Sequence, residues 1–434
     1  MFEVFRNAWK VAELRKKILY TLFIIVIFRL GSCVFVPFLD NSVIANMLNQ
    51  GDGGSLLNYL DTMTGGSLSQ GTLFAMSITP YINASIIIQL LAVAIPALEK
   101  LSKEGDEGRK KLNKITKFLS LGLAVFQAVA FYIYLRSAGA VAYTNGFEGV
   151  LAAVTIVSCF VAGASLIIWL GDQINEKGIG NGISMILFAG IVARGPSAVL
   201  ALVQSMTADM KNAIFVPIIL IIFVLMIGLV VLMTNAERRI PVQYAKRVVG
   251  RKMYGGQSTH IPIKVAMAGV MPIIFAMSIM SLPQTICSFF GIYGDGRSGN
   301  DFWEGFVRLF SQSSILYAVL YFFLIIGFNY FYIAIQYNPV EIANNLKKNN
   351  GAIPGIRPGK PTSDFIQNSL SKISLIGAIF LAFIAIFPII FQQVSGINVS
   401  LGGTTMLIVV GVALETVRSL ESQMMMRHHK GFLE

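Results

Sequence analysis

The stretch FAMSITPYINASIIIQLL, residues 74–91, is apolar enough to cross a lipid bilayer, yet it contains a proline and several hydrogen-bonding side chains. These side chains are Ser77, Thr79, Asn83, Ser85 and Gln89. On a helix with about 100° per residue, one stripe carries Ile78, Ile82, Ser85 and Gln89, with Thr79 and Asn83 on its flank. The stripe indicates either hydrogen bonding between membrane helices or a face that meets water or a passing polar ligand, and this helix alone favours the former.

The composition of the whole chain is that of a polytopic membrane protein. Of its 434 residues, 55% are hydrophobic and only 13% are charged, with a mean hydropathy of +0.69. A soluble fold of this length needs a more polar exterior, with about 25% charged residues. The three cysteines, Cys33, Cys159 and Cys287, lie in apolar runs and predict no disulfide framework. No hydrolase, zinc-protease or nucleotide-binding motif occurs, so we expect neither an enzyme nor a cofactor or metal site.

Ten segments are long and apolar enough to cross a bilayer as helices. They are residues 18–37, 72–95, 115–136, 150–171, 183–203, 213–235, 268–290, 315–337, 373–394 and 402–425. The first is not a cleaved signal peptide, because its apolar run is too long and lacks a cleavage site.

The distribution of basic residues predicts the orientation. If the N-terminus is cytoplasmic, 28 of the 34 Lys and Arg residues lie on the inner side and only Arg136, Lys211, Arg297 and Arg308 lie outside. Arg29 and Arg194 lie within or near the ends of spans, and Arg29 is close enough to the outer end to snorkel. Both termini are therefore predicted to be cytoplasmic, and the net charge of +12 belongs to the cytoplasmic face. Phe2, Phe5, Trp9 and Ala12 form an apolar stripe, so the N-terminal segment 1–17 is expected on the inner membrane interface.

The segment between the first two spans, residues 55–72, is too polar to cross and too apolar for a solvated loop. It contains Asp61 and the Gly65–Gly66 pair. Irregular backbone at membrane depth survives only where protein or a water-filled cavity surrounds it. The sequence leaves two interpretations open: an amphipathic stretch on the outer surface, or a short helix folded back into a cavity.

Acidic residues are missing from the centres of the spans, since Asp172 and Glu415 lie toward cytoplasmic ends. Ion-coupled transporters usually carry such residues at membrane depth. A small-molecule transporter is therefore disfavoured, although a passive channel is not. An intramembrane protease would need Ser and His or paired Asp within the spans, and it is the weakest alternative.

Two cytoplasmic loops, residues 236–266 and 338–372, are longer than topology requires and are basic. Their basic residues include Arg238, Arg239, Lys246, Arg247, Arg251, Lys252, Arg357 and Lys360. Arginines mixed with tyrosine and glutamine on projecting loops favour docking of a large negatively charged partner, such as ribosomal RNA or an acidic protein surface.

Long motifs along the whole chain resemble the bacterial SecY family of protein-conducting translocation channels. They are ITPYINASIIIQLL (78–91), WLGDQINEKGIGNGIS (169–184), GGQSTHIPIKV (255–265), NPVEIANNLKKNNGAIPGIRPGK (338–360) and GGTTMLIVVGVALET (402–416). The resemblance implies an all-α fold of ten transmembrane helices in two inverted five-helix halves around a central pore. The halves would be residues 18–203 and 213–425, with a cytoplasmic tail at 426–434.

The resemblance also implies the roles of particular residues. The family's hydrophobic pore ring corresponds to Ile78, Ile82, Ile183, Leu187, Ile274 and Ile408. Leu187 replaces the family's common isoleucine, and its branched apolar side chain should preserve the seal. The family's plug, which closes the outer funnel, corresponds to residues 55–72, including Leu56, Leu57, Leu60, Met63, Gly65 and Gly66. Candidates for polar residues along the lateral gate are Thr79, Asn83, Gln89, Gln127 and Gln284. Ordinary helix contacts are an equally good explanation of each single glutamine.

Finally, the resemblance implies the setting. The chain would act in the bacterial cytoplasmic membrane with SecE, SecG and either the SecA ATPase or the ribosome. It would bind signal peptides and nascent preproteins and would release apolar segments into membrane lipid. The basic loops would dock SecA or the ribosome, Arg357 being the most sensitive position, and ATP would be used by SecA and not by this chain.

Overall fold

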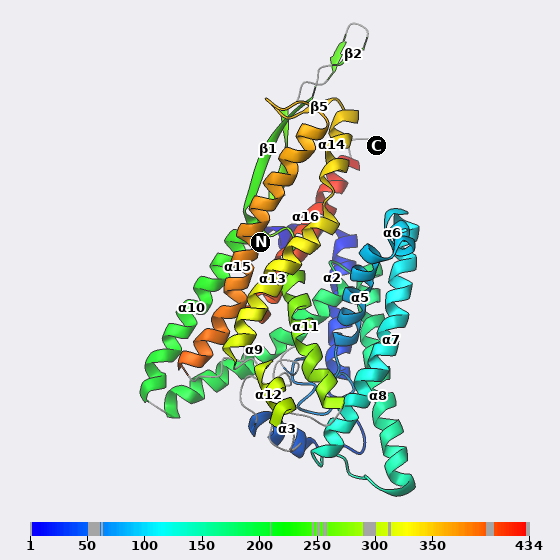
Figure 1. Cartoon of the computed structure of the whole chain (residues 1–434), viewed down its shortest axis with the longest axis vertical. Helices are drawn as coiled ribbons and strands as arrows, with labels where there is room; N and C mark the ends of the chain where they lie inside the picture. Colours follow the sequence, from blue (N-terminus) through cyan, green and yellow to red (C-terminus); the bar gives the residue numbers. More distant parts are fainter. Residues whose placement is uncertain are drawn as a thin grey trace.

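A computed structural model of the chain describes residues 2–50, 61, 64–208, 210–244, 247–249, 252–254, 258–289, 301–310, 314–395 and 403–430. Helices dominate this part of the chain (Figure 1). In the first half they are α1 (Phe2–Lys10), α2 (Ala12–Gly31), α3 (Asn41–Gln50), α5 (Thr79–Ala94), α6 (Pro96–Lys103), α7 (Asp106–Ser137), α8 (Gly146–Lys177) and α9 (Gly182–Ala208). In the second half they are α10 (Met210–Asn235), α11 (Met271–Phe289), α12 (Asp301–Leu309), α13 (Ile315–Gln336), α14 (Pro339–Lys348), α15 (Lys360–Ser395) and α16 (Gly403–Lys430).

Each of the ten predicted spans coincides with a helix, so the predicted class, an all-α polytopic membrane protein, is confirmed. Among the described residues, six helical stretches, containing α7, α8, α9, α10, α13 and α15, are long and apolar enough to cross a membrane on their own. A seventh is added if α5 and α6, which meet at a bend of 107°, count as one span. Charged residues shorten the apolar runs of α2 and α16, and the number of ten spans stays a prediction.

The ends of several helices differ from the predicted spans, and two of these differences have a clear physical reason. The span predicted at 72–95 is helical only from Thr79, because Ser77 has a positive φ of 49° and Pro80 occupies the first turn. The residues before it form turns that are buried among other helices. By contrast, α15 begins at Lys360, well before the predicted start at residue 373, because a helix can continue beyond the apolar run that defines a span.

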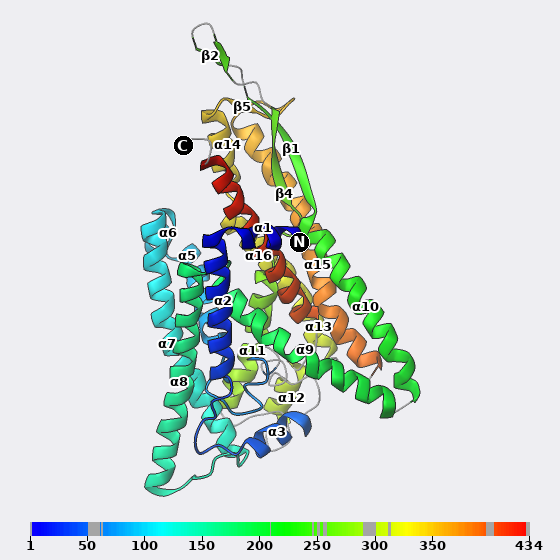
Figure 2. The same cartoon turned by 180° about the vertical axis from the view of Figure 1, so that it is seen from behind.

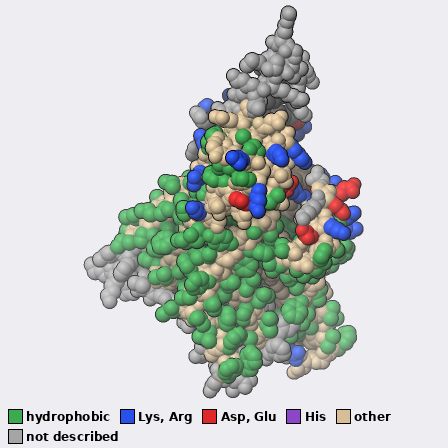
Figure 3. Space-filling view, turned by 45° about the horizontal axis from the view of Figure 1, so that its top comes forward, with side chains coloured by type: hydrophobic (Ala, Val, Ile, Leu, Met, Phe, Trp, Pro, Cys, Tyr) green, Lys and Arg blue, Asp and Glu red, His purple; other side chains and the backbone are tan. Residues whose placement is uncertain are grey.

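The predicted inner and outer segments lie at opposite ends of the molecule. In Figures 1 and 2, α6, α14 and the strands lie toward one end, while α3, α12 and the α7–α8 connection lie toward the other. Exposed Lys and Arg side chains gather near the first end, above a broad band of exposed hydrophobic side chains (Figure 3). This separation agrees with the predicted topology, in which the basic end is cytoplasmic.

The described parts of the loop predicted at 236–266 form paired antiparallel strands. Strand β1 (Glu237–Tyr244) pairs with β4 (Ser258–Lys264), and Gln243 and Tyr244 of β1 pair with β5 (Gly351–Ala352). Two short strands, β2 (Arg247–Val249) and β3 (Lys252–Tyr254), form the tip. Since β5 belongs to the second basic loop, the two loops form one unit, the β-unit, over a shared core that includes Ile240, Val242, Ile353 and Ile366.

The helices pack in two groups that meet at two seams. Within the first group, α7 contacts α5 and α8, while α8 contacts α2 and α9; within the second, α13 contacts α11 and α15, and α16 contacts α10 and α15. One seam joins α9 to α10 and α16, and the other joins α11 to α5 and α7. The candidate site lies between these groups.

Candidate functional site

Aliphatic and aromatic side chains from both groups meet in one cluster, which we term the central apolar cluster. Its buried members include Phe28 of α2, Ile78 at the start of α5, Leu187 of α9 and Ile408 of α16. Ile82 and Ile183 pack against it while remaining partly exposed. The structure therefore brings five of the six predicted ring residues together from three separate parts of the chain.

The sixth predicted residue, Ile274 of α11, is half-buried and is not among the described residues assigned to this cluster. Val270, one turn earlier, packs against the cluster instead, and its side chain lies close to Gly411 of α16. The structure thus makes Val270 the span-seven residue nearest the cluster, while the role of Ile274 in a pore stays a prediction.

The start of α9 is fixed by a glycine and two asparagines, which sets the direction of Ile183 and Leu187. The Asn181 side chain accepts a hydrogen bond from the amide of Ile183 at 3.1 Å, as an N-cap does. The Asn175 side chain accepts one from the amide of Gly182 at 2.7 Å. A Cβ at Gly182 would lie 1.9 Å from the Gly171 carbonyl oxygen, so only glycine lets α9 approach α8 this closely.

The start of α5 is held by backbone contacts on the preceding turns. The Leu73 amide donates to the Val34 carbonyl at 2.9 Å, and a Cβ at Gly163 of α8 would lie 1.9 Å from the Leu73 carbonyl oxygen. The Ile78 carbonyl then accepts the amides of Tyr81 and Ile82, both at 3.0 Å, which starts the helix. These contacts hold Ile78 at 1% exposure inside the cluster.

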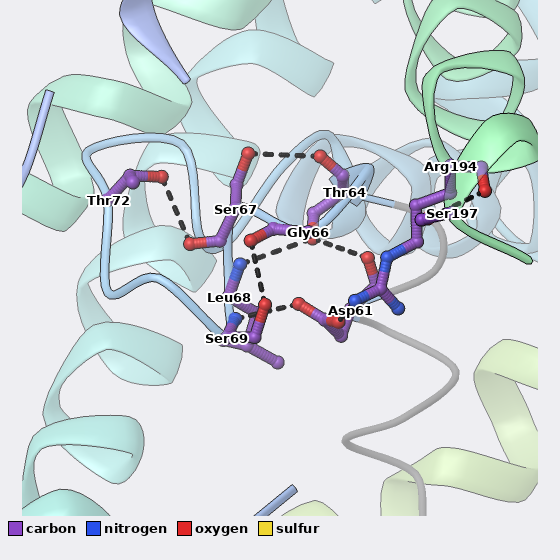
Figure 4. Close-up of polar contacts among 9 residues, drawn as sticks. All are labelled: Asp61, Thr64, Gly66, Ser67, Leu68, Ser69, Thr72, Arg194 and Ser197. Carbon is purple, nitrogen blue, oxygen red and sulfur yellow. Dashed lines mark hydrogen bonds and ion pairs between the residues drawn. The ribbon is translucent and has the colours of Figure 1, made fainter. Parts of the chain in front are cut away.

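Part of the segment predicted as a plug is buried as turns stabilised by their own hydrogen bonds (Figure 4). The Thr72 hydroxyl donates to the Ser67 carbonyl, and the Ser67 hydroxyl donates to the Thr64 carbonyl, both at 3.0 Å. Thr64, Ser67, Leu68 and Thr72 are all at most 4% exposed. For these residues the structure favours the folded-back interpretation over a stretch on the outer surface.

The glycine pair of this segment adopts left-handed backbone conformations, with φ of 70° at Gly65 and 91° at Gly66. The other plug residues inferred from the resemblance, Leu56, Leu57, Leu60 and Met63, lie outside the described residues.

The sequence did not reveal the partners of the charged residues near this segment. Arg194 of α9 forms an ion pair with buried Asp61, and Arg29 of α2 donates to the backbone carbonyls of Ala189 and Gly190. The interpretation that Arg29 snorkels toward the interface is therefore wrong, because its guanidinium group bonds to the backbone of α9. The only signal was that both arginines lie near the outer ends of apolar spans.

The predicted lateral-gate residues belong to α5, α7 and α11, and α11 contacts both other helices at one seam. Asn83 is buried, whereas Thr79, Gln89 and Gln127 are half-buried. Gln89 donates to Ser85 of its own helix at 3.3 Å, so this part of the stripe is hydrogen-bonded within α5. Gln284 lies on α11. The structure places these residues on the helices that form the seam, and both their position along it and their gating role stay predictions.

The basic residues of the β-unit include exposed Arg238, Arg239, Arg357 and Lys360. Arg239 donates to Glu237 at 2.8 Å, which lowers the pKa of the Glu237 carboxyl. Partial burial lowers the pKa of Lys264, and the nearby positive charge of Arg418 lowers it further. The predicted docking residues Lys246 and Arg251 lie outside the described residues, while Arg247 and Lys252 belong to β2 and β3. A positively charged surface suits a negatively charged partner.

Across the described residues, no group of His, Cys, Asp and Glu side chains could hold a metal ion. The arrangement that these residues do form is a buried apolar cluster between the two helix groups, with buried polar turns packed against α2 and α9. Such an arrangement can restrict the passage of water and ions without chemical reaction.

Comparison with known proteins gives matches over nearly the whole chain. The SecY family's sequence model matches residues 72–417. The protein translocase subunit SecY of Mycobacterium tuberculosis is 39% identical over 447 residues, covering 100% of both chains.

Solved structures share the fold at lower identity. One of them is a SecY channel whose plug domain stabilises the closed state and maintains a membrane seal. It matches with a TM-score of 0.65 at 19% identity. The match covers 94% of this chain and 92% of that one. Sec61 in a canine ribosome–channel complex matches with a TM-score of 0.61 at 18% identity, with the same coverage.

Proposed function

This chain belongs to the SecY family, and on that premise we propose that it is the pore-forming subunit of a protein translocase. Unfolded preproteins would cross the membrane through the central apolar cluster. The observation that carries the proposal is the convergence of Ile78, Leu187 and Ile408 from α5, α9 and α16 into one buried cluster between the two helix groups. A packed core within one group would not need residues from both.

The physical basis of the proposed pore is an apolar collar. Aliphatic side chains form no hydrogen bonds with water, so a narrow ring of them excludes ions when it is empty. For the same reason they form no directional bonds to a moving peptide, and any sequence can slide past them. The channel itself would therefore perform no chemistry, consistent with a non-enzymatic subunit that needs no cofactor.

The seam between α11 and the pair α5 and α7 is the proposed lateral exit for apolar segments and the site where signal peptides bind. In this proposal Asn83 of α5 and Gln127 of α7 would place polar groups along that seam, and the closed state would have to shield them. When a hydrophobic signal segment enters the seam, it replaces the contacts between these helices. The seam would therefore have a closed and an open state, and the open state would have the higher affinity for apolar peptides. Release into lipid then follows from the hydrophobicity of the segment.

The energy for transport would come from partners, because the sequence contains no nucleotide-binding motif. We propose that SecA or the ribosome docks on the basic β-unit, with Arg357 at its exposed edge, and that SecE and SecG complete the complex. The proposed setting is the bacterial cytoplasmic membrane, with the β-unit and both termini in the cytoplasm. Sec61, which shares the fold, occurs in a ribosome–channel complex, and this supports the ribosome as a partner.

The test is photo-crosslinking of a stalled secretory chain to probes at Ile82, Ile183 and Ile408. All three should crosslink to the translocating chain, because each contacts or belongs to the central apolar cluster. A probe at Ile376, which is 58% exposed on α15, serves as a control on the exposed surface of the helices, away from the central apolar cluster. Crosslinks at Ile376 without any at the three cluster positions would refute the proposed path.

A further inference from the structure

A buried ion pair ties the polar segment to α9 (Figure 4). The Asp61 carboxylate is 3% exposed, and its Oδ2 lies 2.5 Å from Nη2 of Arg194. Its other oxygen, Oδ1, accepts a hydrogen bond from the amide of Ser69 at 2.7 Å. The Asp61 carbonyl also accepts the amide of Gly66 at 2.9 Å. Asp61 thus joins the turn around the glycine pair to a cation on a neighbouring helix.

A second arginine, on helix α2, lies against the same turn. Arg29 of α2 donates to the Gly190 carbonyl at 3.0 Å. A Cβ at Gly65 would lie 2.7 Å from Nη2 of Arg29 and 2.6 Å from the Gly190 oxygen. At Gly66, a Cβ would lie 3.5 Å from Nε of Arg194. The glycine pair therefore lies between two guanidinium groups, and Gly65 has no room for a side chain.

Both arginines are placed by helices that also contribute to the central apolar cluster. Arg194 follows Leu187 by seven residues, which is about two helical turns, so both lie on one face of α9 at a separation of about 10 Å. Arg29 follows Phe28, whose ring stacks on Phe74 with centroids 5.6 Å apart. The polar contacts and the collar are thus parts of the same helix arrangement.

We propose that Asp61 and Arg194, together with Arg29, form a latch that holds the turn at residues 64–72 beneath the collar, which makes both arginines positioning residues for the closed channel. This rests on the proposed function. A buried charge is tolerated only when it is paired, so removal of one partner penalises the docked position of the turn. When the turn leaves, water hydrates the charges of Asp61 and Arg194. The strength of this ion pair therefore helps to set the equilibrium between the docked and released positions of the turn.

The experiment measures resting ion leak from proteoliposomes that contain the complete channel complex without substrate. Arg194→Gln leaves Asp61 unpaired, and we expect leak to rise at least about tenfold. The double variant Asp61→Asn with Arg194→Gln removes both charges, and it should leak less than Arg194→Gln alone. Arg194→Lys keeps the positive charge and should restore most of the seal. The matched control is Lys117→Gln, which breaks the 2.6 Å ion pair with Asp172 away from this turn and should leave leak unchanged.

A labelling measurement reports the position of the turn directly. Ser67 is 1% exposed, so Ser67→Cys, in a variant with Cys33, Cys159 and Cys287 replaced by serine, should react slowly with a membrane-impermeant maleimide. Adding Arg194→Gln should accelerate this reaction at least about tenfold if the turn is released. A purely structural role would change thermal stability without changing the labelling rate or the ranking of the variants.

Ile82→Asn separates the latch from the channel function. Suppose that Ile82→Asn leaks, whereas Arg194→Gln is as tight to ions and as slowly labelled as the unmodified channel. This result would overturn the latch and leave the proposed pore intact. A double variant that leaks as much as Arg194→Gln would also overturn it, because the unpaired charge would then not be the cause. If no variant leaks, Ile82→Asn included, both the latch and the proposed pore fail.

Discussion

Substitution of Ile408 by asparagine tests whether the central apolar cluster is the seal. Ile408 is 2% exposed on α16 and lies in the cluster with Ile78 and Leu187. The change removes a buried apolar side chain, worth about 1.5–3 kcal/mol, and buries an amide without a partner, at a cost of about 1–3 kcal/mol. The dry arrangement therefore becomes less favourable by about 2.5–6 kcal/mol, a factor between about 10² and 10⁴. Hydration of the collar avoids much of this cost, and ions follow water.

The assay is the rate of ion loss from proteoliposomes containing the complete channel complex at rest, normalised to the number of channels. Ile408→Asn should leak, whereas Ile408→Leu keeps the apolar volume and should remain tight. A second control places the same change at Ile384 of α15, which is fully buried in the core of the second helix group. Ile384→Asn should lower the unfolding temperature without opening a path for ions.

Two results would refute this reasoning. If Ile408→Asn is as tight as the unmodified protein while Ile384→Asn is destabilised, the cluster is an ordinary core and the seal lies elsewhere. If both asparagine variants leak equally, the leak reports general loosening of the helices rather than a hydrated collar.

Two further predictions concern docking and packing. Arg357→Glu should strongly reduce SecA-driven transport into vesicles, because the family resemblance makes Arg357 the most sensitive position of the β-unit. Lys348→Glu reverses another exposed charge of the same unit and should have a smaller effect. Equal transport by both variants would contradict a special role for Arg357. Gly163→Ala should destabilise the protein by about 1–3 kcal/mol in thermal unfolding, because its Cβ would collide with the Leu73 carbonyl. Gly122→Ala on α7 meets no atom within 4 Å and should be neutral or stabilising by up to about 1 kcal/mol, so similar losses at both glycines would show that the close approach is unimportant.

Much of the fold was predictable because a bilayer imposes length and hydrophobicity on every span. Each predicted span therefore coincides with a helix, while the exact ends do not. The helix at 72–95 begins late because Ser77 and Pro80 interrupt it, which hydropathy does not register. The hairpin at β1 and β4 was missed, although buried Ile240 and Val242 alternate with exposed residues as in a strand.

The candidate site was predictable only in its apolar part. Ile78 and Ile82 lie on one helical stripe, and the family resemblance supplied their partners on α9 and α16. The polar contacts could not be predicted, because Asp61 and Arg194 are far apart in sequence and no periodicity relates them. In the sequence Asp61 belongs to the segment between the first two spans and Arg194 lies within or near the end of another span, and only the packing of α9 beside the turn makes them a pair.

The apolar collar and the Asp61–Arg194 pair respond differently to a shift of α9, because the energy of an ion pair depends more strongly on geometry than that of apolar contacts. Dispersion and hydrophobic contacts in the collar are non-directional, so aliphatic side chains can follow small shifts of α9 while the collar remains dry. The Asp61–Arg194 pair depends on short distances, and partial separation leaves two poorly solvated charges. Leu187 and Arg194 move together, since both belong to α9. A shift of this helix that the collar tolerates can therefore already destabilise the docked turn, so release of the turn should precede hydration of the collar.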